Sequence, residues 1–134
     1  MKIRSYRKDY EMFLTQFKWD YMVTIRKNYR TNENVVRSTS NKLINQIDEI
    51  ETAVYVGEVD SIDDKNLHIH ILLTTNNKNA VLNQLNKHKS KNKGDDIVIT
   101  DIETQPEIGS SYVTKQFDLS LRKNKNIVWD LIIK

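Results

Sequence analysis

Two histidines separated by one residue form the most chemically informative pattern in the sequence. His68 and His70 lie within Leu-His-Ile-His-Ile-Leu-Leu, a run typical of a β-strand. Successive side chains of a strand point to opposite faces, so both histidines project from one face while the alternating aliphatic residues point into the core. Two imidazoles about 6–7 Å apart on one strand face can bind a single cation. The same spacing also suits a pair of surface or interface histidines without a metal.

Glu58 offers a carboxylate that a hairpin would bring to the same face. The β-rich runs 52–60 and 66–75 are joined by a short polar segment, which predicts a hairpin. If the turn centres on Asp63, Glu58 lies opposite His68, and directly opposed residues of a ladder face the same side. A register slip of one residue would lose this arrangement, and Glu58 would then be an ordinary charge at the hairpin edge. Two imidazole nitrogens and one carboxylate suit Mn²⁺ or Mg²⁺ when phosphate supplies further ligands, although zinc and iron also bind such a set.

A tyrosine and a lysine stand one helical turn apart later in the chain. Tyr112 and Lys115 lie in the segment 109–117, whose pattern predicts a helix. Tyrosine ionises near pH 10 in water, so it is a weak nucleophile unless a nearby cation stabilises the phenolate. Lys115 can do this, or can neutralise the charge of a phosphate. The alternative is that Tyr112 is a core or rim residue of its helix.

These residues need a scaffold, and hydrophobic periodicity predicts one. Helical spacing of apolar residues predicts helices at 8–17, about 36–50 (capped by Ser38 or Ser40), 77–89 and 106–119. Alternating or β-rich runs predict strands at 19–26, 52–60, 66–75, 97–102 and 127–133, with a lysine-rich loop at 87–96. Few connections in this order require parallel strands. We therefore expect an α+β fold in a single domain, residues 1–134, with a mainly antiparallel five-stranded sheet and flanking helices.

The composition excludes several classes of protein. The chain has 134 residues, of which 38% are hydrophobic and 29% charged, as in a folded globular domain. It contains no cysteine, which excludes disulfides, thiolate metal sites and a cysteine nucleophile. No apolar run approaches the roughly 18 residues of a membrane span, and the first ten residues are too charged for a signal peptide, so we expect a cytoplasmic protein in the interior of a host cell. The net charge of +3 permits a polyanionic partner without requiring one.

Taken together, these motifs resemble those of the HUH endonucleases, in particular the rolling-circle replication initiators (Rep proteins) of small viruses and plasmids. That family is marked by an early strand motif, a later His–hydrophobic–His strand and a Tyr-x-x-Lys helix. The chain carries these in the same order, as Asp20-Tyr-Met-Val-Thr-Ile25, His68-Ile-His70 and Tyr112-Val-Thr-Lys115. The resemblance covers about residues 19–120, which is most of the chain.

The resemblance implies an enzyme that nicks and rejoins single-stranded DNA on an RRM-like, ferredoxin-like sheet. His68, His70 and Glu58 match the family's metal ligands, and Tyr112 matches the nucleophile that forms a 5′-phosphotyrosine and releases a 3′-hydroxyl. Gln116 is an alternative third ligand, because the related single-tyrosine transposases carry a metal-binding Gln at that position. The implied partners are single-stranded or hairpin DNA at an origin and a host or separate helicase and polymerase. Whether the chain forms a homodimer is left open.

Several basic residues and one tyrosine are candidates for DNA binding. Basic side chains can follow a phosphate backbone, and a tyrosine ring can stack on a base. The alternative for each cluster is solvated charge on a loop, and His88 receives no role. The candidates are Arg26, Lys27, Tyr29, Arg30, Lys89, Lys91, Lys93 and Arg122.

Three other functions compete with the replication initiator. The first is a single-tyrosine transposase of an insertion sequence, which uses the same chemistry on different DNA. The second is a non-catalytic RNA- or DNA-binding module on the same fold, for which Tyr112 would be dispensable. The third is an iron oxygenase with two histidines and one carboxylate, which would leave Tyr112 and Lys115 without a role.

Overall fold

The computed structural model describes residues 16–59, 66–103 and 128–134. Its elements are β1 (Tyr21–Arg26), α2 (Glu33–Gln46), β2 (Ile50–Val59), β3 (Leu67–Thr75), α3 (Lys78–Lys91), β4 (Asp96–Asp101) and β5 (Trp129–Ile133). The five strands form one sheet in the order β4-β1-β3-β2-β5, and each pair of neighbours is antiparallel. The α+β class and the five-stranded antiparallel sheet predicted from the sequence are therefore confirmed.

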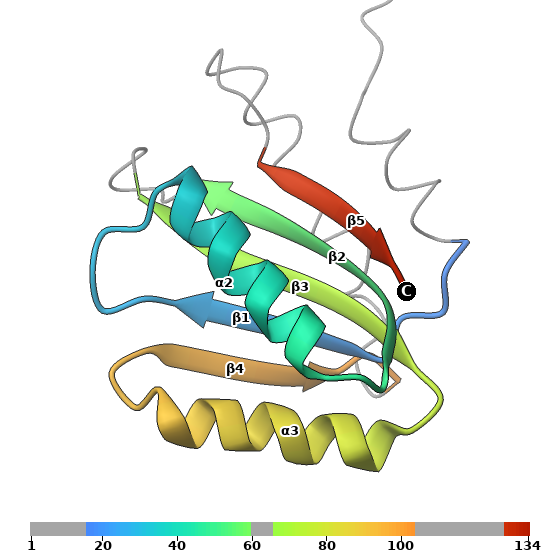
Figure 1. Cartoon of the computed structure of the whole chain (residues 1–134). Coiled ribbons are helices and arrows are strands. Elements are labelled where there is room, and N and C mark those ends of the chain that lie inside the picture. Colours follow the sequence, from blue (N-terminus) through green and yellow to red (C-terminus); the bar gives the residue numbers. More distant parts are fainter. Residues whose placement is uncertain (1–15, 60–65, 104–127) are drawn as a thin grey trace, which may run out of the picture.

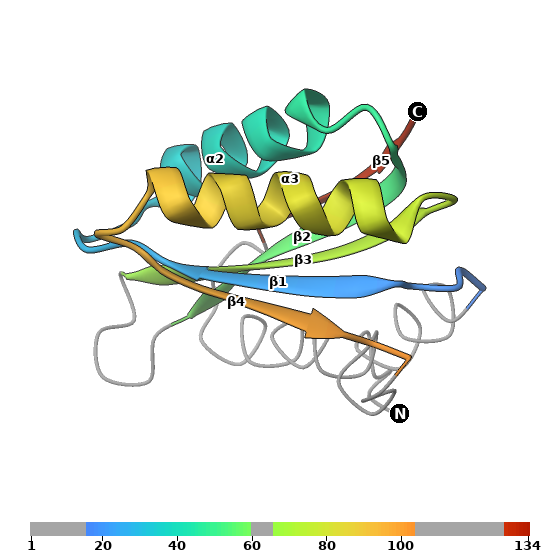
Figure 2. The same ribbon diagram turned by 90° about the horizontal axis from the view of Figure 1, so that it is seen from below.

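The first six described elements follow the βαββαβ order of a ferredoxin-like layout. The chain passes from β1 through α2 to β2, and β3 then inserts between these two strands. Strand β1 in turn lies between β3 and β4. Both helices lie on one face of the sheet (Figures 1 and 2). Among the described residues, the opposite face of the sheet carries no helix.

Strand alternation divides the apolar residues into two cores. Between the helices and the sheet lie the buried side chains of Val23, Ile25, Ala53, Tyr55, Ile69, Ile71 and Leu73, with Val36, Leu43, Ile44, Val81 and Leu85 from the helices. The opposite face carries a smaller core of Trp19, Met22, Val54, Val56, Leu72 and Ile102. The aliphatic residues beside the two histidines belong to the helix-side core, so the histidines face the other way.

The helix bounds differ from those predicted. Asn32 caps α2, because its side chain accepts a hydrogen bond from the amide of Val35 at 3.0 Å, so the helix begins before Ser38 and Ser40. Ile50 belongs to β2, not to the helix.

The lysine-rich segment 87–96 is not a loop throughout, because α3 continues to Lys91. Lysine is a good helix former, and cations in the last turn interact favourably with the helix dipole. The predicted helices at 8–17 and 106–119 and the hairpin turn lie outside the described residues, apart from residues 16 and 17, which are not helical.

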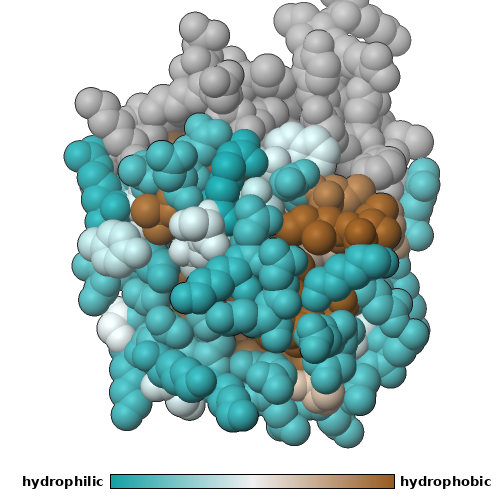
Figure 3. Space-filling model, viewed as in Figure 1, coloured by the Kyte–Doolittle hydropathy of each residue, from teal (hydrophilic) through white to brown (hydrophobic). Residues whose placement is uncertain are grey.

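The face that carries the helices is mainly hydrophilic over α2 and α3, with an apolar area beside β5 (Figure 3). At that edge Ile133 is 68% exposed. Within the described ranges, no helix has the length and apolar character needed to cross a membrane.

Candidate metal and active site

The register of the central hairpin is the one that the sequence predicted. Glu58 on β2 lies directly opposite His68 on β3, and His70 lies opposite Val56. On its other side His70 faces Thr24 of β1. The antiparallel register therefore places Glu58, His68 and His70 on one sheet face, opposite the helices.

His70 is the buried centre of this group. Its side chain is only 1% exposed, and that of Glu58 is 13% exposed. His70 Nε2 lies in hydrogen-bonding contact with the Glu58 carboxylate, and His70 Nδ1 lies 3.0 Å from the Thr24 hydroxyl oxygen. Both ring nitrogens thus have a partner. This arrangement holds the imidazole in one orientation in the middle of the sheet.

The Thr24 hydroxyl suits either protonation state of the ring. An ionised carboxylate only accepts, so Nε2 donates its proton to Glu58. In the neutral ring the Thr24 hydroxyl then donates to Nδ1, and in the cationic ring Nδ1 donates to Thr24. Thr24 can also accept from Nδ1 when Nε2 carries no proton, which is the form in which a histidine binds a metal.

The donor chemistry of this group fits a hard divalent cation. With Nδ1 donating to Thr24, the Nε2 lone pair is directed at the Glu58 carboxylate, so the pair offers one nitrogen and one oxygen ligand. His68 is half-buried on the same face, opposite Glu58. Across residues 16–59, 66–103 and 128–134, however, no three histidine or carboxylate side chains are grouped closely enough to hold a metal ion. The structure thus brings Glu58 and His70 together and leaves His68 beside them.

Thr24 is the residue of this site that sequence reasoning missed. Its place on the polar face of β1 could be read from the alternation of that strand. Its partner could not, because Thr24 and His70 are 46 residues apart and meet only through the pairing of β1 with β3.

The remaining catalytic candidates cannot be placed relative to this site. The nucleophile Tyr112, the adjacent Lys115, the alternative ligand Gln116 and the basic residue Arg122 all lie outside the described residues. Their roles stay predictions.

The candidate DNA-binding residues near β1 divide between the two faces of the sheet. Arg26 ends β1 with the same parity as Thr24 and so belongs to the face of His70. Tyr29 and Arg30 follow on an exposed loop, where the Tyr29 ring is 53% exposed. Lys27 instead forms an ion pair with Asp95 at 3.1 Å, with side-chain exposures of 12% and 9%. Arg26 is therefore the basic residue of this group that shares a face with the histidine site.

Three further lysines were candidates in the same class. Lys89 and Lys91 project from the last turn of α3, and Lys93 lies in the turn that follows the helix. Helix α3, which carries Lys89 and Lys91, lies on the face of the sheet opposite to that of His70 (Figures 1 and 2).

Comparison with known proteins does not assign a family. No protein-family model, no curated protein and no solved structure matches the chain. The likeness to HUH endonucleases therefore rests on the three motifs in the sequence.

Proposed function

We propose that the chain is a metal-dependent enzyme that nicks and rejoins single-stranded DNA, acting as a replication initiator of the HUH type. The observation that carries this proposal is the contact between Glu58 and His70, which the hairpin register brings together on the face opposite the helices. The nucleophile, the DNA substrate and the third metal ligand of the proposal rest on the sequence motifs around His68 and Tyr112.

Each residue has a defined task in this reaction. Glu58, His70 and His68 would hold the divalent ion, Mn²⁺ or Mg²⁺, with Gln116 as the alternative third ligand. When bound there, the ion supplies Lewis acidity toward an oxygen of the scissile phosphate. Thr24 fixes the orientation of the His70 ring, so that Nε2 is directed at the Glu58 carboxylate.

Tyr112 performs the strand cleavage. Its phenol loses a proton and its oxygen forms a bond to phosphorus, while the bond from phosphorus to the 3′-oxygen breaks and that oxygen takes up a proton. Lys115 stabilises the phenolate or the phosphate charge. Because the 5′-phosphotyrosine retains the phosphodiester energy, a 3′-hydroxyl can reverse the step and join a strand without ATP.

The DNA partner is single-stranded or hairpin DNA at an origin. Arg26 shares the face of the histidine site, and the exposed Tyr29 and Arg30 lie just beyond the end of β1. A strand that crosses this end of the sheet would meet a cation and a stacking surface before it reaches His70. Duplex unwinding and synthesis fall to a host or separate helicase and polymerase in the cytoplasm.

A non-catalytic nucleic-acid-binding module is the second candidate. One observation favours it, namely that the direct contact of His70 with Glu58 satisfies both groups without a metal. In that case the pair would be a structural element of the sheet, and Tyr112 would have no chemical task.

A covalent-adduct assay tests the proposal. The protein is mixed with labelled single-stranded and hairpin oligonucleotides and Mn²⁺, and a denaturing gel is searched for a protein band shifted by DNA. We expect an adduct that Tyr112→Phe and a chelator both abolish, while Tyr6→Phe retains it. Glu58→Gln should reduce the yield strongly, and Glu51→Gln, an exposed carboxylate on the same strand, should not.

The outcomes separate the candidates. An adduct that forms equally well without metal would refute the metal role of Glu58 and His70. DNA binding with no adduct on any oligonucleotide would support the binding module. Adducts confined to the hairpin ends of an insertion sequence would indicate a transposase.

A further inference from the structure

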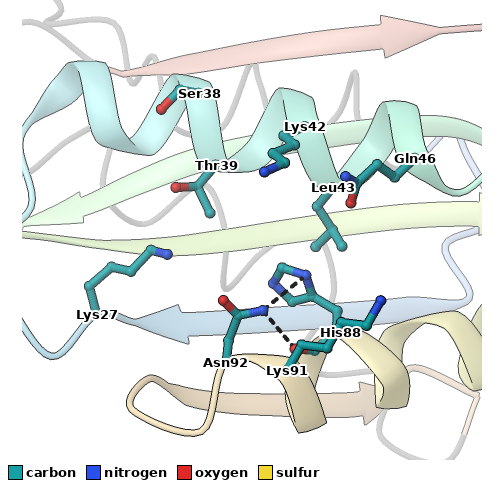
Figure 4. Close-up of a pocket in the computed structure, with 9 residues that line it drawn as sticks. All are labelled: Lys27, Ser38, Thr39, Lys42, Leu43, Gln46, His88, Lys91 and Asn92. Carbon is teal, nitrogen blue, oxygen red and sulfur yellow. Dashed lines mark hydrogen bonds between the residues drawn. The ribbon is translucent and has the colours of Figure 1, made fainter.

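A polar cavity lies on the side of the sheet opposite to the Glu58–His70 pair. It has a volume of about 340 Å³ and opens between α2 and α3, with Lys27 contributed from the end of β1 (Figure 4). Its polar lining includes Lys27, Thr39, Lys42, His88, Lys91 and Asn92. Cavities of this size commonly hold small molecules.

His88 presents a hydrogen-bond donor in this cavity. Its ring extends from α3 into the space between the helices (Figure 4). The amide nitrogen of Asn92 lies 2.8 Å from the carbonyl oxygen of His88 and 3.4 Å from Nδ1. Because this NH₂ group only donates, Nδ1 is the acceptor and the proton of the neutral ring is on Nε2.

The Nε2 donor is left without a partner. Nε2 is buried and makes no hydrogen bond within the part of the chain that the structure describes. A buried donor without an acceptor costs about 1–3 kcal/mol, so an acceptor from a ligand would be stabilising.

The charges around His88 are mainly positive. Burial lowers the pKa of His88, and the ammonium groups of Lys27, Lys42 and Lys91 lower it further, whereas Asp95 acts in the opposite direction. Lys27 and Asp95 form an ion pair with each other, so their charges largely cancel. Lys42 and Lys91 form no ion pair among the described residues, which leaves two cations beside the neutral ring.

We propose that this cavity binds a small phosphorylated ligand through its phosphate group. The phosphate is neutralised by Lys42 and Lys91, with the Thr39 hydroxyl as a further donor. Because Nε2 is buried, a small rotation of the His88 ring accompanies binding and lets Nε2 donate to the phosphate. A phosphate group carries nearly two negative charges and three strong acceptor oxygens, which matches the two lysines, whereas a carboxylate carries one charge. The volume of about 340 Å³ suits a small molecule better than an extended DNA backbone. This site is independent of the proposed nicking activity, since it lies on the other side of the sheet.

A signal for His88 was present in the sequence. Val81, Leu85 and His88 follow the i, i+4, i+7 spacing of one helical stripe, and the first two are buried in the core. The stripe places His88 at the inner face of α3, but only the approach of α2 supplies Lys42 and Thr39.

The test is a titration of the full chain with inorganic phosphate, followed by the side-chain nitrogen and proton signals of His88 in NMR. We expect saturable shifts at His88 and an increase in its pKa, because a bound anion offsets the neighbouring lysines. Sulfate, whose charge is constant between pH 5 and 8, should bind more tightly as the pH falls through the His88 titration. Lys42→Gln and Lys91→Gln should each weaken binding on the order of tenfold.

Controls make the result decisive. Lys18→Gln removes an exposed lysine that does not line the cavity and should leave the affinity unchanged. An equal loss with Lys18→Gln would indicate unspecific charge attraction and overturn the proposal. Absence of any His88 shift up to tens of millimolar phosphate would also overturn it. Shifts caused only by a single-stranded oligonucleotide, and not by phosphate, would reassign the cavity to a nucleic-acid contact.

Discussion

The hydrogen bond between Thr24 and His70 provides the sharpest test of the site geometry. Thr24→Val replaces a hydroxyl by a methyl group of similar size and retains the β-branched shape that favours a strand. Thr24 is 6% exposed and His70 is 1% exposed, so water cannot replace the lost partner of Nδ1. An unsatisfied buried group costs about 1–3 kcal/mol, partly offset by up to about 0.8 kcal/mol from the newly buried methyl group.

Thr100→Val is the matched control for this substitution. Thr100 lies on β4, opposite Met22 and on the same sheet face as Thr24, but its hydroxyl makes no hydrogen bond to a described residue. Thr100 is half-buried, so a methyl contribution is present in both variants and cancels in part when they are compared. We expect the free energy of unfolding of Thr24→Val to lie about 1–3 kcal/mol below that of Thr100→Val.

Urea unfolding, followed by tryptophan fluorescence, measures this difference. Thr24→Ser should recover most of the loss, because it restores the hydroxyl and removes only a methyl group. If the proposed metal site is correct, Thr24→Val should also weaken Mn²⁺ binding by about 10–100-fold through the loss of ring orientation. Equal stabilities for Thr24→Val and Thr100→Val would refute the role assigned to Thr24.

Two further predictions concern packing and pH. Gly57→Ala should destabilise the fold by about 1–3 kcal/mol in urea unfolding, because its Cβ would lie 3.3 Å from Val128 Cβ. Gly94→Ala is the control, and it should cost clearly less, because its Cβ would meet only the exposed end of the Asn28 side chain. Similar losses for the two alanines would contradict this packing argument. The pKa of His88 is lowered by burial in the folded state, so the unfolded chain binds the proton more readily, and stability should fall as the pH drops below about 6.5. His88→Gln should remove that part of the pH dependence in unfolding curves measured from pH 7.5 to 5, and an unchanged profile would exclude His88 as its source.

Local patterns in the sequence were sufficient for much of the hairpin. The period of two around His68 and His70 determined that both project from the same face, because a strand has only two faces. The symmetric spacing of the two β-rich runs also predicted Glu58 opposite His68, which the structure confirms. The face of the histidines and the position of Glu58 both arise within one hairpin, whose two strands are close in the sequence. The alternation of apolar residues is then enough to set the register of the hairpin.

Helix ends were harder to predict because capping competes with hydrophobic periodicity. Apolar spacing suggested that the second helix continues to Ile50, but Asn32 starts α2 earlier and the chain turns into β2 at that isoleucine. Lysines that alternate with polar residues near the end of α3 resemble a loop in the sequence. Their helical state depends on cooperative extension from the buried stripe of Val81 and Leu85.

The sequence by itself determined the fold class, the paired histidines and the carboxylate that faces them. Only the tertiary structure decided that β1 lies beside β3, which gives His70 its partner Thr24, and that α2 lies beside α3, which places Lys42 near His88. The physical reason is the range of the contacts. Alternation and turn spacing act within a few residues, whereas the Thr24–His70 contact and the approach of Lys42 to His88 join residues about 46 positions apart. Both follow from burying the two helices on one face of the sheet.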